Sequence, residues 1–263
     1  MTKKSFYILL LISTLFTSCI PIKDLVYLQD KNSSEEQGKI AVVESKPYRL
    51  QVNDIINIDI KAIDPKLVSI FNTTETSSAS GKTESTLYFN GFTVDDHGNI
   101  RMPIVGEINV IGYTLEEVRI IIEKKLLEEY FKSEANIFVT VKLAGFRYTI
   151  NGEVVSTGTK TLFKEHVTIL EAIANAGDIT TVGDRKAVTV IRQTPTGVEL
   201  HDIDLTDVNV LKSPYYYLQP NDYVYVKPLR QKTWGTGQTG IQSVGTIITL
   251  LSLATTVYLI LKN

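Results

Sequence analysis

Cysteine and histidine are scarce in this chain, and neither occurs in a pattern that supports metal or nucleophilic chemistry. Cys19 is the single cysteine. His97, His166 and His201 are far apart, and no two of them have a metal-ligand spacing such as His-x-x-x-His. The sequence therefore predicts no metal site, and it offers no histidine cluster for acid–base work.

An excess of charge of one sign is also lacking. The 27 basic and 29 acidic residues give a formal net charge of -2, which offers no basis for nucleic-acid binding. There is no Gly-x-Ser-x-Gly elbow, and Gly235, Gly237 and Gly240 are not a dinucleotide fingerprint because no strand immediately precedes them. We expect no enzyme, no cofactor and no nucleic-acid partner.

The beginning of the chain has the layout of a secretory signal. Lys3 and Lys4 precede an apolar run over residues 6–16, which is shorter than the roughly 20 apolar residues of a comfortable membrane span. Leu15-Phe16-Thr17-Ser18-Cys19 resembles a bacterial lipobox. This resemblance implies that Cys19 is acylated as the first residue of the mature protein, anchored in lipid and with no free thiol left.

Residues 241–261 are an uncharged stretch that would extend about 31 Å as a helix, which matches a hydrocarbon core. Polar residues recur along it at helical spacing and form one narrow stripe: Gln242, Thr246, Thr249, Ser252 and Thr256. The stripe suits a helix–helix contact of a single-pass anchor. A second reading is several copies in a ring, with the stripe facing a wet lumen and the apolar face meeting lipid.

The middle of the chain is predicted to be mixed sheet and helix. Ile56, Ile58 and Ile60 alternate with polar residues as in a half-buried strand. The segment Asp95-Asp96-His97-Gly98 between apolar flanks predicts a hairpin, with Gly98 at the permissive turn position. Residues 137–143 alternate as a further strand. These elements make a first unit over roughly residues 48–143.

Two capping boxes mark two helices. Thr114 with Glu117 opens a helix whose apolar face carries Leu115, Val118, Ile121, Ile122 and Leu126. Thr168 with Glu171 opens a shorter helix in a second unit of similar order, over roughly residues 147–228. We therefore predict an α+β fold of two small mixed domains, followed by an amphipathic transmembrane helix.

A motif near the start of the first unit recurs near the end of the second. Tyr48-Arg49-Leu50-Gln51-Val52-Asn53-Asp54 is echoed by Tyr216-Tyr217-Leu218-Gln219-Pro220-Asn221-Asp222, and an apolar strand follows each copy. The Asn-Asp pair suits a turn in which side chains bond nearby backbone amides. We interpret the echo as a shared turn-to-strand device and not as a binding site.

Several of these motifs resemble known families. Residues 48–56, 94–108 and 112–117 resemble the polysaccharide biosynthesis/export domain. A resemblance to the soluble-ligand-binding β-grasp (SLBB) domain is found in residues 151–154, 168–173, 176–177, Arg185 and 217–222. With the lipobox and the terminal helix, the whole resembles Wza-type outer-membrane polysaccharide export lipoproteins.

The resemblance implies a division of the chain into six parts. These are a signal peptide (1–18), a flexible tether (19–46), the export domain (47–145), the β-grasp domain (146–229), a linker (230–240) and the transmembrane helix (241–261). It also implies a homo-oligomeric ring in the outer membrane, with its body in the periplasm. The ring would dock onto an inner-membrane polysaccharide co-polymerase or tyrosine kinase.

The function expected from the sequence is a channel subunit that exports capsular or exopolysaccharide. Cys19 would carry the lipid, and Gln242, Thr246, Thr249, Ser252 and Thr256 would face the lumen. The alternative is a membrane-anchored scaffold lipoprotein that grips glycan or a partner without a pore. A third reading, an envelope hydrolase, needs a pair of catalytic carboxylates, and the sequence offers no candidate pair.

Overall fold

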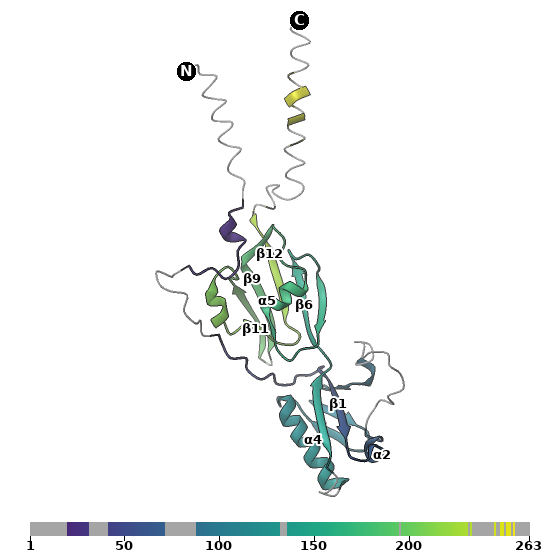
Figure 1. Ribbon diagram of the computed structural model, residues 1–263. Coiled ribbons are helices and arrows are strands. Elements are labelled where there is room, and N and C mark those ends of the chain that lie inside the picture. Colours follow the sequence, from purple (N-terminus) through teal and green to yellow (C-terminus); the bar gives the residue numbers. More distant parts are fainter. Residues whose placement is uncertain are drawn as a thin grey trace.

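The computed structural model describes two mixed α/β units that follow one another along the chain (Figure 1). The residues described are 20–31, 42–71, 88–131, 136–194, 196–230, Lys232 and, near the C-terminus, Gly245, Ile248, Thr249, 251–253 and Thr255. Several small sheets and few helices make up the fold, as the α+β prediction requires.

The first unit is built on a three-stranded antiparallel sheet in the order β2-β1-β5. Its strands are β1 (Ile55–Lys61), β2 (Phe92–Thr93) and β5 (Phe138–Leu143). Ile56, Ile58 and Ile60 are buried and alternate with half-exposed neighbours, which confirms the predicted strand.

The turn predicted at residues 95–98 forms, but the strands around it pair differently from a simple hairpin. Gly98 has φ +80° and its amide donates to the carbonyl of Asp95. Strand β2 before the turn pairs with β1. Strand β3 (Asn99–Met102) after the turn pairs with β4 (Gly106–Asn109) around a second turn. Thus the local turn was predicted correctly, whereas the choice of partner strand depends on the tertiary fold.

Helix α4 (Leu115–Glu129) covers the sheet of the first unit. Its capping box is present in full, because Thr114 Oγ1 accepts from the Glu117 amide and Glu117 accepts from the Thr114 amide. Val118, Ile122 and Leu126 are fully buried in one cluster with β1 and β5. The short helix α2 (Pro65–Val68) contributes Val68 to the same cluster.

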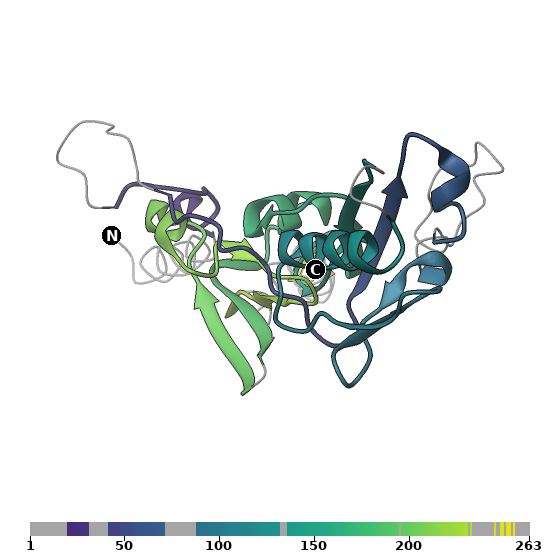
Figure 2. The ribbon, with the colours of Figure 1, turned by 90° about the horizontal axis from the view of Figure 1, so that it is seen from below.

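The second unit contains a five-stranded sheet in the order β10-β9-β12-β6-β7. Its strands are β6 (Phe146–Gly152), β7 (Gly158–Leu162), β9 (Gly183–Thr194), β10 (Gly197–Ile203) and β12 (Tyr223–Pro228). Strands β12 and β6 run parallel, and the other pairs are antiparallel. Figure 2 shows the β9–β10 hairpin projecting away from the rest of the unit.

One face of this sheet packs against α5 (Ile169–Asn175), which lies in front of the strands in Figure 1. The predicted capping box of Thr168 and Glu171 is present. Ile169, Ala172 and Ile173 pack in one cluster with apolar residues of β6, β9 and β12. A short pair of strands, β8 (Val167–Thr168) and β11 (Tyr217–Leu218), and two 3-10 helices, η1 (Ile22–Asp24) and η3 (Val208–Lys212), complete the unit.

The predicted transmembrane helix at residues 241–261 lies largely outside the described residues. Of its described members, Thr249 donates to the Gly245 carbonyl and Ser252 donates to the Thr249 carbonyl, as in a helical turn. Across the part of the chain that the structure describes, no helix is both long enough and apolar enough to span a bilayer.

Candidate functional site at the junction of the two units

The two copies of the repeated motif fold into the same turn. Asn53 and Asn221 have nearly identical left-handed backbones, with φ +69° and +68°. Asp54 Oδ2 accepts from the Gln51 amide at 2.8 Å, and Asp222 Oδ2 accepts from the Gln219 amide at 2.7 Å. This geometry supports the interpretation of the echo as a turn device, because each Asp closes the turn that leads into a strand.

The two turn carboxylates are buried but have different partners. Asp54 is 4% exposed and accepts from the Tyr48 hydroxyl at 2.7 Å. Burial raises the pKa of Asp54 above its usual range, and the hydrogen bonds oppose this shift. Burial and the nearby Asp54 carboxylate also raise the pKa of Tyr48.

Asp222 is held by a buried arginine. It is 1% exposed and accepts from Arg192 Nε at 2.9 Å and from Arg192 Nη2 at 2.7 Å. Burial raises the pKa of Asp222, and the Arg192 guanidinium opposes the shift. Arg192 also donates to the Tyr217 carbonyl, so it ties β9 to both ends of the second turn.

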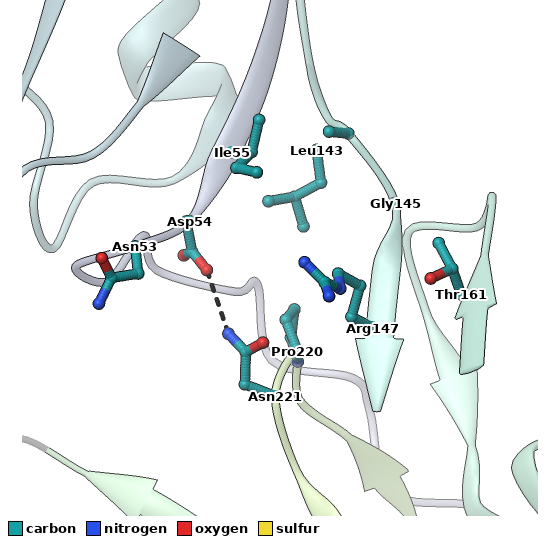
Figure 3. Close-up of a pocket in the computed structure, with 10 residues that line it drawn as sticks. Asn53, Asp54, Ile55, Leu143, Gly145, Arg147, Thr161, Pro220 and Asn221 are labelled. Atoms are coloured by element: carbon teal, nitrogen blue, oxygen red, sulfur yellow. Dashed lines mark hydrogen bonds between the residues drawn. The ribbon is translucent and has the colours of Figure 1, made fainter. Parts of the chain in front are cut away.

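The two turns meet where the units join (Figure 3). The Asn221 side-chain amide donates to Asp54 Oδ1 at 3.4 Å, and the Asn221 backbone amide donates to the Arg147 carbonyl at 2.7 Å. The chain crosses between the units at Leu143-Ala144-Gly145-Phe146. A Cβ atom on Gly145 would lie 2.6 Å from Thr161 Cγ2, so the close approach of the crossing to β7 requires glycine here.

A pocket lies at this junction, between the two turns and the crossing segment. Its lining in Figure 3 comes from both units and includes Asn53, Asp54 and Ile55 from the first, and Arg147, Thr161, Pro220 and Asn221 from the second. A wider groove on the same junction runs between Tyr48, Leu115 and Lys142 of the first unit and residues 163–166 of the second. The arrangement offers hydrogen-bonding and cationic groups to a ligand.

An N-terminal strap, residues 20–31, is bound along the second unit. The backbone amides of Leu28 and Gln29 donate to the carbonyls of Leu205 and Thr206. Asp24 pairs with Lys186, and Lys31 pairs with Asp204. The strap lies within the stretch predicted as a flexible tether, and it consists of the 3-10 helix η1 followed by residues that bond the second unit.

Tyr27 is the central side chain of the strap. Its hydroxyl donates to Asp178, and its ring faces the guanidinium of Arg185 at 5.2 Å. Burial and the Asp178 hydrogen bond raise the pKa of Tyr27 to about 12. Arg185 is 6% exposed and donates to the carbonyls of Ile179 and Thr180. The strap therefore completes the environment of a buried arginine in the second unit.

Most of the site residues predicted from the sequence are not described. Cys19, Gln242, Thr246 and Thr256 lie outside the described residues. Thr249 and Ser252 are described, and both are exposed. Their place in a lumen therefore stays a prediction.

No group of three or more potential metal ligands occurs within the described ranges. His166 contacts Ser45 through Nδ1 at 2.8 Å, and His201 stacks on Tyr215 with ring centroids 3.7 Å apart. The sequence reasoning missed Arg192 and the strap. A signal for Arg192 was present, because it follows Val188 and Val190 in the alternating register of buried residues on β9.

Comparison with known proteins agrees with the order of the two units. Residues 42–143 match the family model of the polysaccharide biosynthesis/export protein, and residues 147–226 match that of the SLBB domain. The chain thus combines an export domain with an SLBB domain, which supports the resemblance of its motifs to Wza-type polysaccharide export proteins.

Two curated relatives are similar to part of this chain. The chain is 29% identical over 175 residues to the EPS I polysaccharide export outer membrane protein EpsA of Ralstonia nicotianae, which covers 63% of this chain and 43% of that protein. It is 29% identical over 161 residues to the protein of the same name from Ralstonia solanacearum, covering 57% and 40%. The matched part spans less than half the length of these relatives.

Proposed function

We propose that this protein is a subunit of an oligomeric outer-membrane channel that exports capsular or exopolysaccharide. The export and SLBB domains support a role in polysaccharide export, and the names of the relatives support an outer-membrane location. In this proposal Cys19 carries the lipid, the two units lie in the periplasm, and residues 241–261 cross the membrane.

The observation that carries the proposal is where the two proposed membrane attachments would leave the folded body. The strap begins directly after Cys19, and its Asp24 pairs with Lys186 of the second unit. The segment after β12 leaves from the same place, since the Leu229 amide donates to the Val182 carbonyl. Lipid and helix would therefore both hold the second unit against the membrane and leave the first unit pointing into the periplasm.

This orientation gives the mechanism of a conduit. The first unit would face an inner-membrane co-polymerase or tyrosine kinase, and the polysaccharide would pass through the ring toward the surface. The terminal helices would surround the lumen with Gln242, Thr246, Thr249, Ser252 and Thr256 facing inward. Hydroxyl groups suit a hydrated sugar chain because their hydrogen bonds are weak and exchangeable. The driving energy would come from synthesis at the inner membrane.

The first test is the oligomer mass of the detergent-extracted mature protein, with and without residues 241–263. We expect a large closed ring for the full chain and conductance in planar bilayers. A monomer under gentle extraction, with no conductance, would reject the channel and leave a membrane-anchored binding scaffold.

A paired substitution tests the lumen assignment. Replacing Thr249 and Ser252 with Leu should reduce export at least about tenfold, because a wet lumen would lose its hydroxyl lining to apolar bulk. Ala254→Leu adds bulk on the opposite side of the predicted helix and is the matched control. Normal export by the lipidated double variant would exclude Thr249 and Ser252 from the lumen.

A further inference from the structure

The five-stranded sheet of the second unit has one face that α5 does not cover. Tyr148 and Ile150 of β6 point to the α5 side, where the Tyr148 hydroxyl donates to the Ala172 carbonyl. Because side chains alternate along a strand, Thr149 and Asn151 point to the other side. On β12, Val224 and Val226 are buried, whereas Tyr223 and Tyr225 are half-exposed on that other side.

The pairing registers place these side chains in continuous rows. Tyr223 lies opposite Thr149 on β6 and opposite Ile191 on β9, and Ile191 in turn lies opposite the exposed Leu200 of β10. Tyr225 lies between Asn151 and Thr189 in the next row. A row across five strands spans about 19 Å at the usual strand spacing. We call Thr149, Asn151, Gln193, Tyr223 and Tyr225 the tyrosine face.

The polar groups of the tyrosine face are already oriented. Asn151 Nδ2 donates to the Tyr223 hydroxyl at 2.9 Å, and Thr149 and Thr159 share a hydrogen bond at 3.2 Å. Gln193 is exposed at the outer end of β9. Half-exposed tyrosine rings give a large, rigid contact area with one wet end, at a small cost in side-chain entropy.

The chemistry of this face fits a sugar chain better than a nucleic acid. Asp202 and Lys227 balance each other in an ion pair at 2.7 Å, and Arg147 lies opposite Thr161 of β7. Tyrosine rings can pack against the C–H faces of pyranose rings, while amides and hydroxyls can bond the sugar hydroxyls. Arg147 and Thr161 also line the junction pocket, so the face continues into that pocket.

We propose that the tyrosine face is a glycan-binding surface, along which the sugar chain in transit makes stacking contacts with Tyr223 and Tyr225. The inference rests on the proposed export of polysaccharide and adds to it a binding surface outside the membrane. A row of about 19 Å accommodates several linked sugar residues. Contacts of this kind are short-lived, which lets the chain advance while water fills the remaining surface.

The test is affinity electrophoresis of the full-length, detergent-solubilised protein. The gels contain the extracellular polysaccharide purified from the bacterium that makes the protein. Tyr223→Thr and Tyr225→Thr remove the rings and keep strand propensity. We expect each to weaken retardation about fivefold. Tyr113→Thr, on the first unit, is the matched control and should migrate like the native protein.

A second pair of variants separates a loss of binding from a loss of folding. Asn151→Ala and Gln193→Ala change exposed side chains, so the fold should survive, and each should weaken retardation about twofold to fivefold. Retardation of the native protein should persist in about 0.5 M salt, since the contacts are not ionic. Absence of retardation in the native protein, unchanged retardation in all four variants, or loss of retardation in salt would each overturn the proposal.

The result of the glycan-binding test can be distinguished from the result of the channel test. A protein that forms a conducting ring but is not retarded rejects the tyrosine face alone. A monomer without conductance that is retarded through Tyr223 and Tyr225 rejects the channel and keeps the binding surface.

Discussion

At the scale of single residues, the two Asn-Asp turns show how one local motif serves two environments. Asn53 and Asn221 adopt the same left-handed conformation, and each following Asp bonds the amide three residues earlier. The Tyr48 hydroxyl donates a hydrogen bond to the Asp54 carboxylate, whereas the Arg192 guanidinium pairs with the Asp222 carboxylate. The motif predicts the turn, but only the surroundings select the partner.

Asp54 should make stability depend on pH. Burial raises the folded-state pKa of Asp54 above its ordinary value of 3.8. At pH values between 3.8 and this raised pKa, the folded state therefore binds more protons than the unfolded state. The contribution to the free energy of unfolding is therefore full below pH 3.8 and declines as pH rises through the raised pKa. We expect Asp54→Asn, which keeps one of the two acceptor oxygens, to remove this decline.

The measurement is urea unfolding of native and Asp54→Asn protein across the acidic range. The difference between the two curves isolates Asp54 from other carboxylates, such as Asp202, whose pKa is lowered by Lys227. Parallel curves at every pH would contradict the raised pKa of Asp54.

At the scale of elements, the helix starts were predictable because they depend on neighbours in sequence. Thr114 and Thr168 each form both bonds of a capping box. Alternation likewise predicted the buried side chains of β1. The pairing of β3 with β4, and not with β2, was not predictable from the turn signal at residues 95–98, because strand partners are chosen by packing across the sheet.

The contribution of the α4 N-cap to the free energy of unfolding can be measured directly. Thr114→Ala should lower the free energy of unfolding by about 1 kcal/mol, because the Glu117 amide loses its acceptor. Thr114→Ser retains the hydroxyl and should stay near the native value. Thermal or urea unfolding measures both; equal destabilisation by Ala and Ser would mean that the methyl group, and not the cap, carries the effect.

At the scale of the whole molecule, the strap joins the start of the described chain to its second unit. Leu28 and Gln29 bond a segment more than 170 residues away in sequence, and Tyr27 bonds Asp178. The first unit follows the strap in sequence, yet the strap binds the second unit, which is nearer the C-terminus. This contact decides which unit would lie against the membrane in the proposed channel.

Removing the strap's anchor should loosen the surface it covers. Tyr27→Ala loses the ring over Arg185 and the bond to Asp178, so amides of residues 178–186 should exchange hydrogen about tenfold faster. Helix α4 belongs to the first unit and serves as the internal reference. Tyr27→Phe keeps the ring and should show a smaller effect, and unchanged exchange in Tyr27→Ala would mean that the strap does not stabilise this surface.

The sequence by itself determined the elements whose signals are local: the capped helices, the alternating strands, the two Asn-Asp turns and the family resemblance of the two units. The tertiary structure alone decided what is brought together across long separations. It joined Asn221 to Asp54, buried Arg192 against Asp222, bound the strap to the second unit and left Tyr223 and Tyr225 half-exposed. The physical reason is that capping and alternation act within a few residues, whereas strand order and burial depend on how the whole chain packs.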